Sequence, residues 1–469
     1  MTENLAKVLF GPRPRRGVVL GLRVPQLAVL VAGGAVATAL LGRGPAGSLA
    51  ALVVAVTAAG VALLPIGGRH GDEWLPVLAR YATRPRTARR RVGAPPGGAA
   101  VLEVPGARLE LTAVEVAGGR RVGVVVDSRR RTVTAVAALR GAGSLALLEP
   151  GEQWRRGQGF AALLAALGRD GAAVLQVQWV HRTRPMPTVE LDRVAAPVAP
   201  SRWAAADASY RGLLDTVGGE LVRHDMFLTV TVRGRAGDLD PLLRELATVQ
   251  DSADAAGITV TGWLPPRLLG AAVRTGYDPG AVAVVAARDD DPDTAGVHPG
   301  VAGPAATQEG WRWFACDGAV HATYWVAEWP RVPVAVDFLA PLLVELRCAH
   351  TVAVVAQPLS SRAAQRATRA ARATDLADAD LRARLGQLDG ARDDAQADAA
   401  DQLDADLAAG HTLFRFHGLL TVTAPTPDAL AAGCAEVEQA AARAHLDLRR
   451  LYGQQAEAFT WTLPVGVGP

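Results

Sequence analysis

Lysine is almost absent from this chain of 469 residues: Lys7 is the only one, and every other strong base is an arginine. A P-loop needs a lysine at the end of its GxxxxGK[ST] motif to reach the β- and γ-phosphates of a nucleotide. The chain has no such motif. Ordinary P-loop ATPases are therefore excluded, and so is Schiff-base chemistry by any lysine beyond residue 7.

Cysteine is scarce as well. Cys316, Cys348 and Cys434 lie far apart and share no CxxC spacing. They cannot form a four-cysteine zinc site, and their odd number argues against a disulfide framework. We expect scattered, buried thiols in a reducing compartment.

Catalytic motifs are also missing. The nine histidines are dispersed, and the sequence contains neither HExxH nor GxSxG. The run Gly157-Gln158-Gly159 resembles the start of a dinucleotide-binding loop, but we expect Pro150 to begin a helix that already contains it, whereas a true loop lies between a strand and a helix. The formal charge of +3 is too small to indicate nucleic-acid binding by itself. The sequence predicts no enzyme, no cofactor and no metal site.

Two long apolar stretches, at 24–42 and 46–66, contain no charged residue. Each has the ~20 residues that a helix needs to cross the hydrocarbon core of a bilayer. Arg43, Gly44 and Pro45 separate them as a turn. A cleaved signal peptide would instead show one short apolar region followed by a cleavage site. We therefore expect a transmembrane helical hairpin over 24–66.

Arginines flank both sides of this hairpin, while its turn carries only Arg43. The positive-inside rule places both flanks in the cytoplasm, so we expect two spans of the inner (plasma) membrane with the amino terminus and the soluble part cytoplasmic. A cluster follows the second span closely enough to contact anionic lipid headgroups, and its members are Arg84, Arg86, Arg89, Arg90 and Arg91.

The soluble part alternates strand-like and helix-like runs. MFLTVTV at 226–232 and ITVTGWLP at 258–265 flank a helix-like run, as do GLLTVTA at 418–424 and LDLRRLYGQQ at 446–455. The sequence thus predicts an α+β fold with a duplicated unit, in which two curved sheets carry helices on one face. The expected segments are a basic terminus (1–23), the hairpin (24–66), a basic linker (67–105), a first α+β unit (106–280), a loop (281–308) and a second unit (309–469).

Residues 361–410 differ in kind, because they are almost wholly Ala, Arg, Asp, Gln and Leu and contain no proline. Helical spacing of the leucines and opposite charges on the two arms predict an inserted helical hairpin. Disorder is the alternative. As a partner-binding arm it would use Arg362, Arg366, Arg369, Leu381, Leu385 and Leu388.

Five runs carry a resemblance to a known family: VVVD at 124–127, SLALLEP at 144–150, QWVHRT at 178–183, HATYWVAEWP at 321–330 and LRRLYGQQ at 448–455. They resemble an actinobacterial integral-membrane family whose members accompany a small two-span membrane protein and a conjugation-type ATPase. The closing pattern of the chain is similar to the amino-terminal domain of type IV secretion traffic ATPases. The resemblance therefore implies a docking domain of such an ATPase without its motor domain.

The function that this resemblance implies is a non-enzymatic, membrane-anchored scaffold of a type IV secretion-like or conjugation-like apparatus. The expected partners are membrane lipids, a conjugation-type ATPase, a small membrane subunit and further copies of the chain. One alternative is a nucleic-acid-contacting subunit of a DNA-transfer machine, which would use the two arginine clusters. Another is a membrane-core subunit of a type VII-like export system, whose subunits also join two spans to a cytoplasmic domain.

Overall fold

A computed structural model describes residues 7–8, 22–64, 67, 69–89, 100–116, 119–141, 147–187, 190–191, 203–218, 221–288, 295–330, 334–384, 405, 407 and 412–469. The chain divides into two compact units. The hairpin unit comprises Phe10–Arg84 and Leu359–Leu413, and the sheet unit comprises Met1–Leu9, Pro85–Pro358 and Phe414–Pro469.

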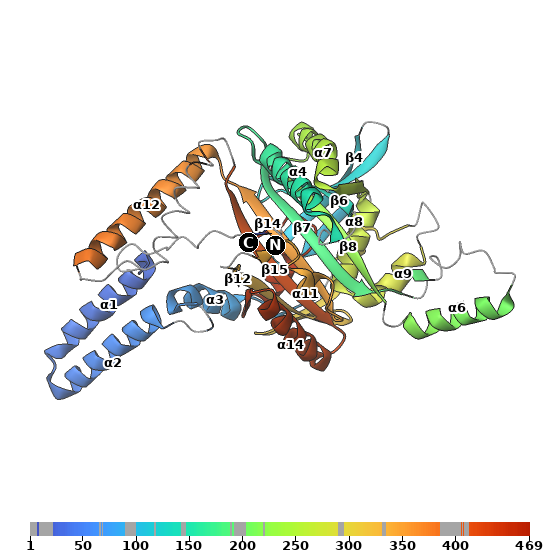
Figure 1. Cartoon of the computed structure of the whole chain (residues 1–469). Helices are drawn as coiled ribbons and strands as arrows, with labels where there is room; N and C mark the ends of the chain where they lie inside the picture. The colour runs from blue at the N-terminus through green and yellow to red at the C-terminus, as the bar shows by residue number, and fades with distance from the viewer. Residues whose placement is uncertain are drawn as a thin grey trace, which may run out of the picture. The chain divides into compact units, whose positions relative to one another are not determined.

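The hairpin unit contains the two apolar helices that the sequence predicts. Helices α1 (Val24–Leu41) and α2 (Gly44–Leu63) are long and apolar enough to cross a membrane, and they pack side by side (Figure 1). Small side chains allow this packing, because a Cβ added at Gly33 would lie 2.3 Å from the Cβ of Ala58. Where α1 begins and α2 ends, the buried Gln26 side chain donates a hydrogen bond of 2.8 Å to the carbonyl oxygen of Ala62.

Residues 67–105 are more ordered than the expected linker. Helix α3 (Gly71–Thr83) occupies much of the segment and tolerates Pro76, and strands β2 (Thr87–Arg89) and β3 (Ala100–Val104) follow. An ion pair joins the Glu73 side chain in the first turn of α3 to Arg23, which precedes α1. The prolines and glycines that suggest a linker stand at 85 and 95–98, outside these three elements.

The sheet unit is built on one large antiparallel sheet of 14 strands. The main path runs β2, β10 (Ala306–Glu309), β11 (Phe314–Cys316), β12 (Ala319–Glu328), β15 (Phe414–Ala424), β14 (Ala349–Pro358), β7 (Val174–Pro185), β8 (Val222–Arg233), β6 (Thr132–Gly141), β5 (Arg120–Asp127), β4 (Ala107–Val116), β3. Off this path, β16 (Asp447–Arg450) pairs with β12 and β9 (Ile258–Trp263) pairs with β6. A separate pair joins β1 (Lys7–Val8) to β13 (Val334–Ala335).

The order of elements along the chain repeats. The first copy runs β5, β6, α4 (Pro150–Gly168), β7, β8, α7 (Asp240–Ala253), β9, α8 (Pro266–Tyr277). The second runs β11, β12, α11 (Ala340–Leu343), β14, β15, α14 (Pro427–Arg443), β16, α15 (Gln455–Thr460). Spatial order repeats too, since β6–β8–β7 corresponds to β12–β15–β14. The expected duplicated α+β unit is therefore confirmed.

Insertions occur at the same connection in both copies. Helix α6 (Ala204–Val217) lies between β7 and β8, and α12 (Ser361–Arg384) lies between β14 and β15. The segment 281–308, expected as a loop, holds short elements: η3 (Pro279–Ala281), α9 (Val282–Ala286), α10 (Pro299–Ala302) and β10. A further short turn, η2 (Asp254–Ala256), follows α7.

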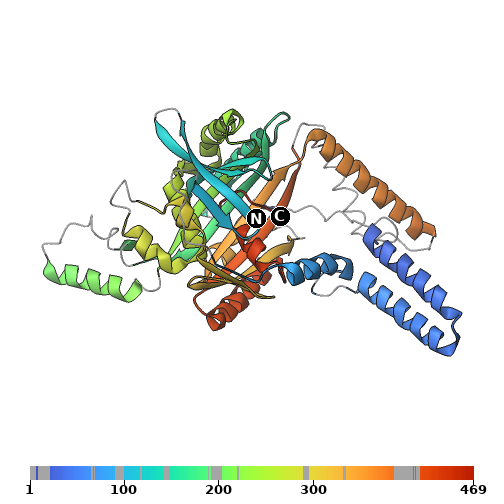
Figure 2. The ribbon, with the colours of Figure 1, turned by 180° about the vertical axis from the view of Figure 1, so that it is seen from behind.

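The expectation of two sheets with helices on one face is wrong in both respects. The copies share one sheet, because β14 pairs antiparallel with β7 and Val354 lies opposite Trp179. Helices also cover both faces, as the two views in Figures 1 and 2 show. The strands are apolar on both sides: in β6, Val133, Ala135 and Ala137 pack with α4 and α7, while Val136 packs on the opposite face. That pattern requires two covering layers.

The opposite face carries a single core that both copies share. Helices α8 and α15 contribute to it, and the segment 461–469 crosses the sheet above it. In the second copy, Thr462 and Thr421 share a hydrogen bond of 3.1 Å. In the first copy, Gln178 on β7 donates to the carbonyl oxygen of Trp461 at 2.7 Å. Farther along, Gly466 packs against the hydroxyls of Thr134 and Thr231. The segment thus spans the seam between the copies.

Candidate functional site

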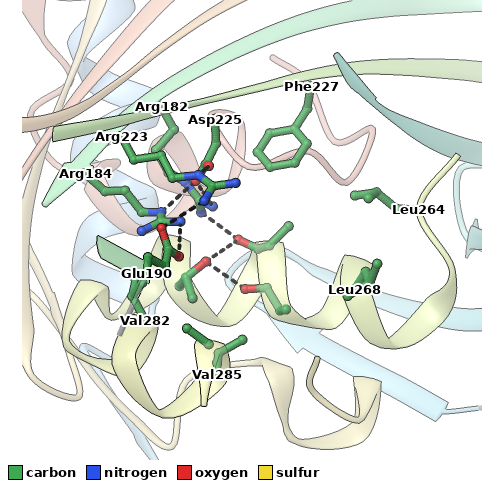
Figure 3. Close-up of a pocket in the computed structure, with 14 residues that line it drawn as sticks. Arg182, Arg184, Glu190, Arg223, Asp225, Phe227, Leu264, Leu268, Val282 and Val285 are labelled. Carbon is green, nitrogen blue, oxygen red and sulfur yellow. Dashed lines mark hydrogen bonds and ion pairs between the residues drawn. The ribbon is translucent and has the colours of Figure 1, made fainter. Parts of the chain in front are cut away.

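The pocket with the most distinctive chemistry lies in the first copy, where β7 ends and β8 begins beside α8 and α9 (Figure 3). Its volume is about 370 Å³. Because side chains alternate along a strand, Arg182 and Arg184 of β7 point to the same face, and Asp225 of β8 lies directly opposite Arg182. The strands therefore deliver a carboxylate and two guanidinium groups to one place.

Asp225 is the centre of a network of ion pairs. Its Oδ2 accepts from Arg184 Nε at 2.8 Å and from Arg182 Nη2 at 3.1 Å, and its Oδ1 lies 3.3 Å from Arg223 Nε. Glu190 is the second carboxylate and accepts from Arg184 and Arg223, each at 2.9 Å. Three guanidinium groups thus meet two carboxylates, which leaves one excess positive charge among the residues that line the pocket.

Burial and charge act in opposite directions on this network. Burial raises the pKa of Asp225, but the charges of Arg182, Arg184 and Arg223 outweigh it, so the net pKa lies below its usual value. The pKa of Arg182 is lowered by burial, and the charge of Asp225 offsets only part of that effect. For Arg184, Asp225 and Glu190 outweigh the effect of burial and raise the pKa. Asp225 is therefore ionised at neutral pH.

The opposite wall of the pocket is apolar. The Arg182 guanidinium lies 5.5 Å from the centre of the Phe227 ring, a cation–π distance. The remaining wall comes from α8, α9 and the residues before α8: Leu264, Leu268, Ala271, Ala272, Val282, Val285 and Ala286, together with Thr275, whose hydroxyl donates to the carbonyl oxygen of Ala271. The pocket is therefore amphipathic, with charges at one end and hydrocarbon along its length (Figure 3).

The second copy lacks the charges of Arg182, Arg184 and Asp225 at the corresponding positions, although Arg415 corresponds to Arg223. The pair Val180–Phe227 of the first copy corresponds to Ala353–Leu419, as the matching TVT runs of β8 and β15 fix the alignment. Two residues further along, Arg182 and Asp225 correspond to Val355 and His417, and Arg184 corresponds to Gln357. The fold is therefore compatible with residues other than the charged network.

A buried cysteine and histidine form a second cluster. Cys316 Sγ lies 3.1 Å from His321 Nε2, and His321 Nδ1 lies 3.0 Å from the hydroxyl of Thr423. Burial raises the pKa of Cys316 far above its usual value and lowers that of His321 to about 3. A nucleophilic cysteine needs a thiolate and access to substrate. This buried pair offers neither, so we interpret it as part of the core.

Three histidines meet at the seam between the copies. The rings of His181 and His224 stack with centroids 5.0 Å apart, and His350 stands on the neighbouring strand β14. Burial is the largest cause that lowers the pKa of His181 to about 4, and repulsion from His224 and His350 adds to it. Among the residues that the structure describes, no group of histidine, cysteine and acidic side chains is suited to hold a metal ion. All three lie on the face of the sheet opposite Arg182.

The structure places only part of the arginine cluster expected at the membrane surface. Arg84 follows α3 and is half-buried, while Arg86 and Arg89 are exposed, with Arg89 in β2 opposite Ala306 of β10. Arg90 and Arg91 lie outside the described residues. The described members are thus attached to ordered elements rather than to a linker.

The expected partner-binding arm is also described in part. Arg362, Arg366 and Arg369 are exposed on α12 and line a shallow surface hollow with Gln365. Leu381 lies in α12, and nothing is described of its side chain. Leu385 and Leu388 lie outside the described residues, as does most of the expected acidic arm.

No protein-family model matches the chain, and no curated protein matches it. The amphipathic pocket is not among the sites that the sequence predicts. One sequence signal could have identified it: Arg182 and Arg184 stand two residues apart at the end of one strand-like run, and Asp225 stands at the start of the next. Charged residues in a central strand are rarely buried unless they are paired.

Proposed function

We propose that this protein is a membrane-anchored, non-enzymatic docking component of a type IV secretion-like or conjugation-like apparatus. In this proposal, α1 and α2 cross the inner membrane, the basic flanks face the cytoplasm, and the sheet unit binds a conjugation-type ATPase and a small membrane subunit. The observation that carries the proposal is a closely packed apolar hairpin joined in one chain to a duplicated sheet domain.

Exposed aromatic side chains support a binding role. Trp203, Tyr210 and Leu213 are exposed and recur at helical spacing at the start of α6 and along it. Aromatic anchors are enriched at the centres of protein interfaces. Their helix occupies the same insertion point as α12, so each copy of the duplicated unit carries one inserted helix.

Co-purification tests the docking role. The full-length protein would be produced with a conjugation-type ATPase of the same organism and extracted in detergent, and the complex would be isolated through a tag on the ATPase. We expect Leu213→Glu to weaken capture, because a charge in an apolar contact must be desolvated. Val284→Glu is the matched control, since Val284 is also exposed but lies in α9. Failure to recover the ATPase with the unaltered chain would refute the docking role.

Labelling with a membrane-impermeant maleimide tests the orientation. We expect a cysteine at Gly42, in the turn between α1 and α2, to react from outside intact cells. A cysteine at Arg89 should react only after the cells are opened. Labelling of position 89 in intact cells would place the sheet unit outside and would remove the proposal.

A second candidate function is contact with nucleic acid. Arg362, Arg366 and Arg369 are exposed and repeat along one face of α12, which is the arrangement that phosphate contacts require. DNA binding by the full-length protein should then weaken steeply as salt rises. The triple substitution to glutamine should flatten that dependence by about 3 in the slope of log affinity against log salt. No binding at low salt would remove this candidate.

A further inference from the structure

We propose that the pocket formed by β7, β8, α8 and α9 binds a small ligand that carries one carboxylate on an apolar body. This inference does not depend on the scaffold role proposed above. It rests on the charge balance of the pocket, on one unsatisfied donor, on the apolar wall and on the difference between the two copies.

The charge balance favours a single negative charge. Arg182, Arg184 and Arg223 face Asp225 and Glu190, so one positive charge is uncompensated within the lining. The Arg182 and Arg184 side chains are each only 9% exposed and pair with Asp225 and Glu190, so the excess positive charge lies on Arg223, which is 50% exposed at the mouth of the pocket. A monoanion restores neutrality, whereas a dianion would bring net negative charge beside the two buried carboxylates.

One buried donor of the network is unsatisfied. Arg182 donates through Nη1 to the carbonyl oxygen of Ala272 at 2.7 Å and through Nη2 to Asp225. Its Nε is buried and, within the described part of the chain, has no hydrogen-bond partner. Arg223 is half-exposed and stands where a ligand would meet solvent. Guanidinium groups are suited to bind the two oxygens of a carboxylate in one plane.

The apolar wall indicates that the part of the ligand beyond its carboxylate is hydrocarbon. Phe227, Leu264 and Leu268 lie on the side of the pocket away from the arginines (Figure 3). Val282 and Val285 of α9 complete the apolar lining. A volume of about 370 Å³ lies near the lower end of the range for small-molecule pockets. Burying the hydrocarbon part of a ligand against this wall removes apolar surface from water and so favours binding.

The second copy serves as an internal control. At the corresponding positions of β14 and β15, in the same register, it has Val355 and His417 in place of Arg182 and Asp225, whereas Arg415 corresponds to Arg223. Buried ion pairs are often no more stabilising than apolar residues of similar volume. The charges of Arg182, Arg184 and Asp225 are therefore not explained by the needs of the sheet, and ligand binding accounts for them.

Calorimetry on the full-length protein in detergent tests the inference with two pairs of probes. The first pair is N-acetyl-leucine and N-acetyl-leucine amide, which resemble a peptide terminus with and without its charge. The second pair is 4-phenylbutyrate and 4-phenylbutanol, which represent a free apolar acid and its neutral counterpart. We expect the acid of at least one pair to bind and both neutral probes to fail. Which acid binds more tightly distinguishes a peptide carboxylate from a free acid.

Substitutions locate the binding. Arg223→Gln removes the half-exposed guanidinium and should weaken acid binding about tenfold, as expected for the loss of one charged hydrogen bond. Arg244→Gln removes the same charge from an exposed position on α7 and should leave binding unchanged. A second variant, Leu268→Glu, places a negative charge in the apolar wall and should abolish binding. Thermal melting confirms that each variant is folded.

Three results would each overturn the inference. The first is no binding of either acid in the millimolar range to the folded protein. The second is equal binding of an acid and its neutral counterpart. The third is an Arg223→Gln variant that binds as well as the Arg244→Gln control.

Discussion

Replacing Gly466 with alanine tests whether the segment 461–469 fastens the two copies together. Gly466 has φ of +72°, and a Cβ there would lie 2.2 Å from Thr134 Oγ1 and 2.6 Å from Thr231 Oγ1. Those two hydroxyls share a hydrogen bond of 2.9 Å in the middle of the buried sheet face. The methyl group must therefore displace either the segment or this pair.

The expected loss of stability has two parts. An alanine with left-handed backbone angles costs ~1–2 kcal/mol relative to glycine. Inserting a methyl group into a filled core costs a further ~1–3 kcal/mol. The free energy of unfolding of the Gly466→Ala variant should therefore fall by ~2–5 kcal/mol, provided the sheet unit unfolds cooperatively.

A matched substitution separates the two parts. Gly119 also has φ of +72°, but nothing lies within 4 Å of an added Cβ. Gly119→Ala therefore has only the backbone cost, ~1–2 kcal/mol. Gly262→Ala, in β9, has neither an unfavourable φ nor a contact within 4 Å, and it should leave stability nearly unchanged.

Denaturant unfolding of the full chain in detergent, followed by tryptophan fluorescence, measures these differences. Trp74 is the one tryptophan outside the sheet unit, so the signal reports mainly on the sheet. If Gly466→Ala and Gly119→Ala agree within ~0.5 kcal/mol, the scatter expected between independent sites, the close contact at Gly466 is refuted.

Three further predictions concern other parts of the chain. First, His181 has a pKa of about 4 in the folded protein, below its ordinary value near 6.5, so the unfolded chain takes up the proton first as pH falls. The contribution of His181 to the free energy of unfolding is therefore greatest above about pH 6.5 and is lost as pH falls towards 4. The His181→Gln variant should lack this pH dependence, which amounts to up to ~3 kcal/mol in unfolding titrations. Second, Gly33→Leu should separate α1 from α2 and slow cross-linking between one cysteine introduced in each helix, whereas Gly34→Leu, where an added Cβ meets nothing within 4 Å, should not. Third, Asp225→Asn should destabilise the sheet unit by ~3 kcal/mol or more, because it leaves the buried Arg182 guanidinium without a carboxylate partner and Arg184 with Glu190 alone. Replacing Arg182 with Val and Asp225 with His together, as in the second copy, should cost less in the same unfolding assay, and a larger cost would contradict the assignment of the charges to ligand binding.

Local patterns predicted much of the fold. Uncharged runs of about 20 residues predicted α1 and α2, and the repeated TVT runs of β8 and β15 predicted the duplication. These features depend on residues that are close in sequence. The orientation in the membrane and the partners stay predictions.

Long-range arrangements were not predictable in the same way. That β7 pairs with β14 depends on strands some 170 residues apart, and either strand alone is compatible with a separate sheet. The amphipathic pocket combines Arg182 of β7, Asp225 of β8 and the apolar faces of α8 and α9, which only the folded sheet brings together. Helix α3 was missed because the prolines and glycines on its carboxyl-terminal side dominate the local composition.

The crossing segment 461–469 has a consequence for biosynthesis. It leaves the ribosome after every strand of the sheet, yet Val465 and Val467 belong to the core that both copies share. During translation, the first copy therefore emerges with this apolar face covered only in part, by α8, until the second copy has also been made. Nascent chains of this protein should depend on chaperones for that interval, and premature termination anywhere before residue 461 should yield insoluble product rather than a stable half.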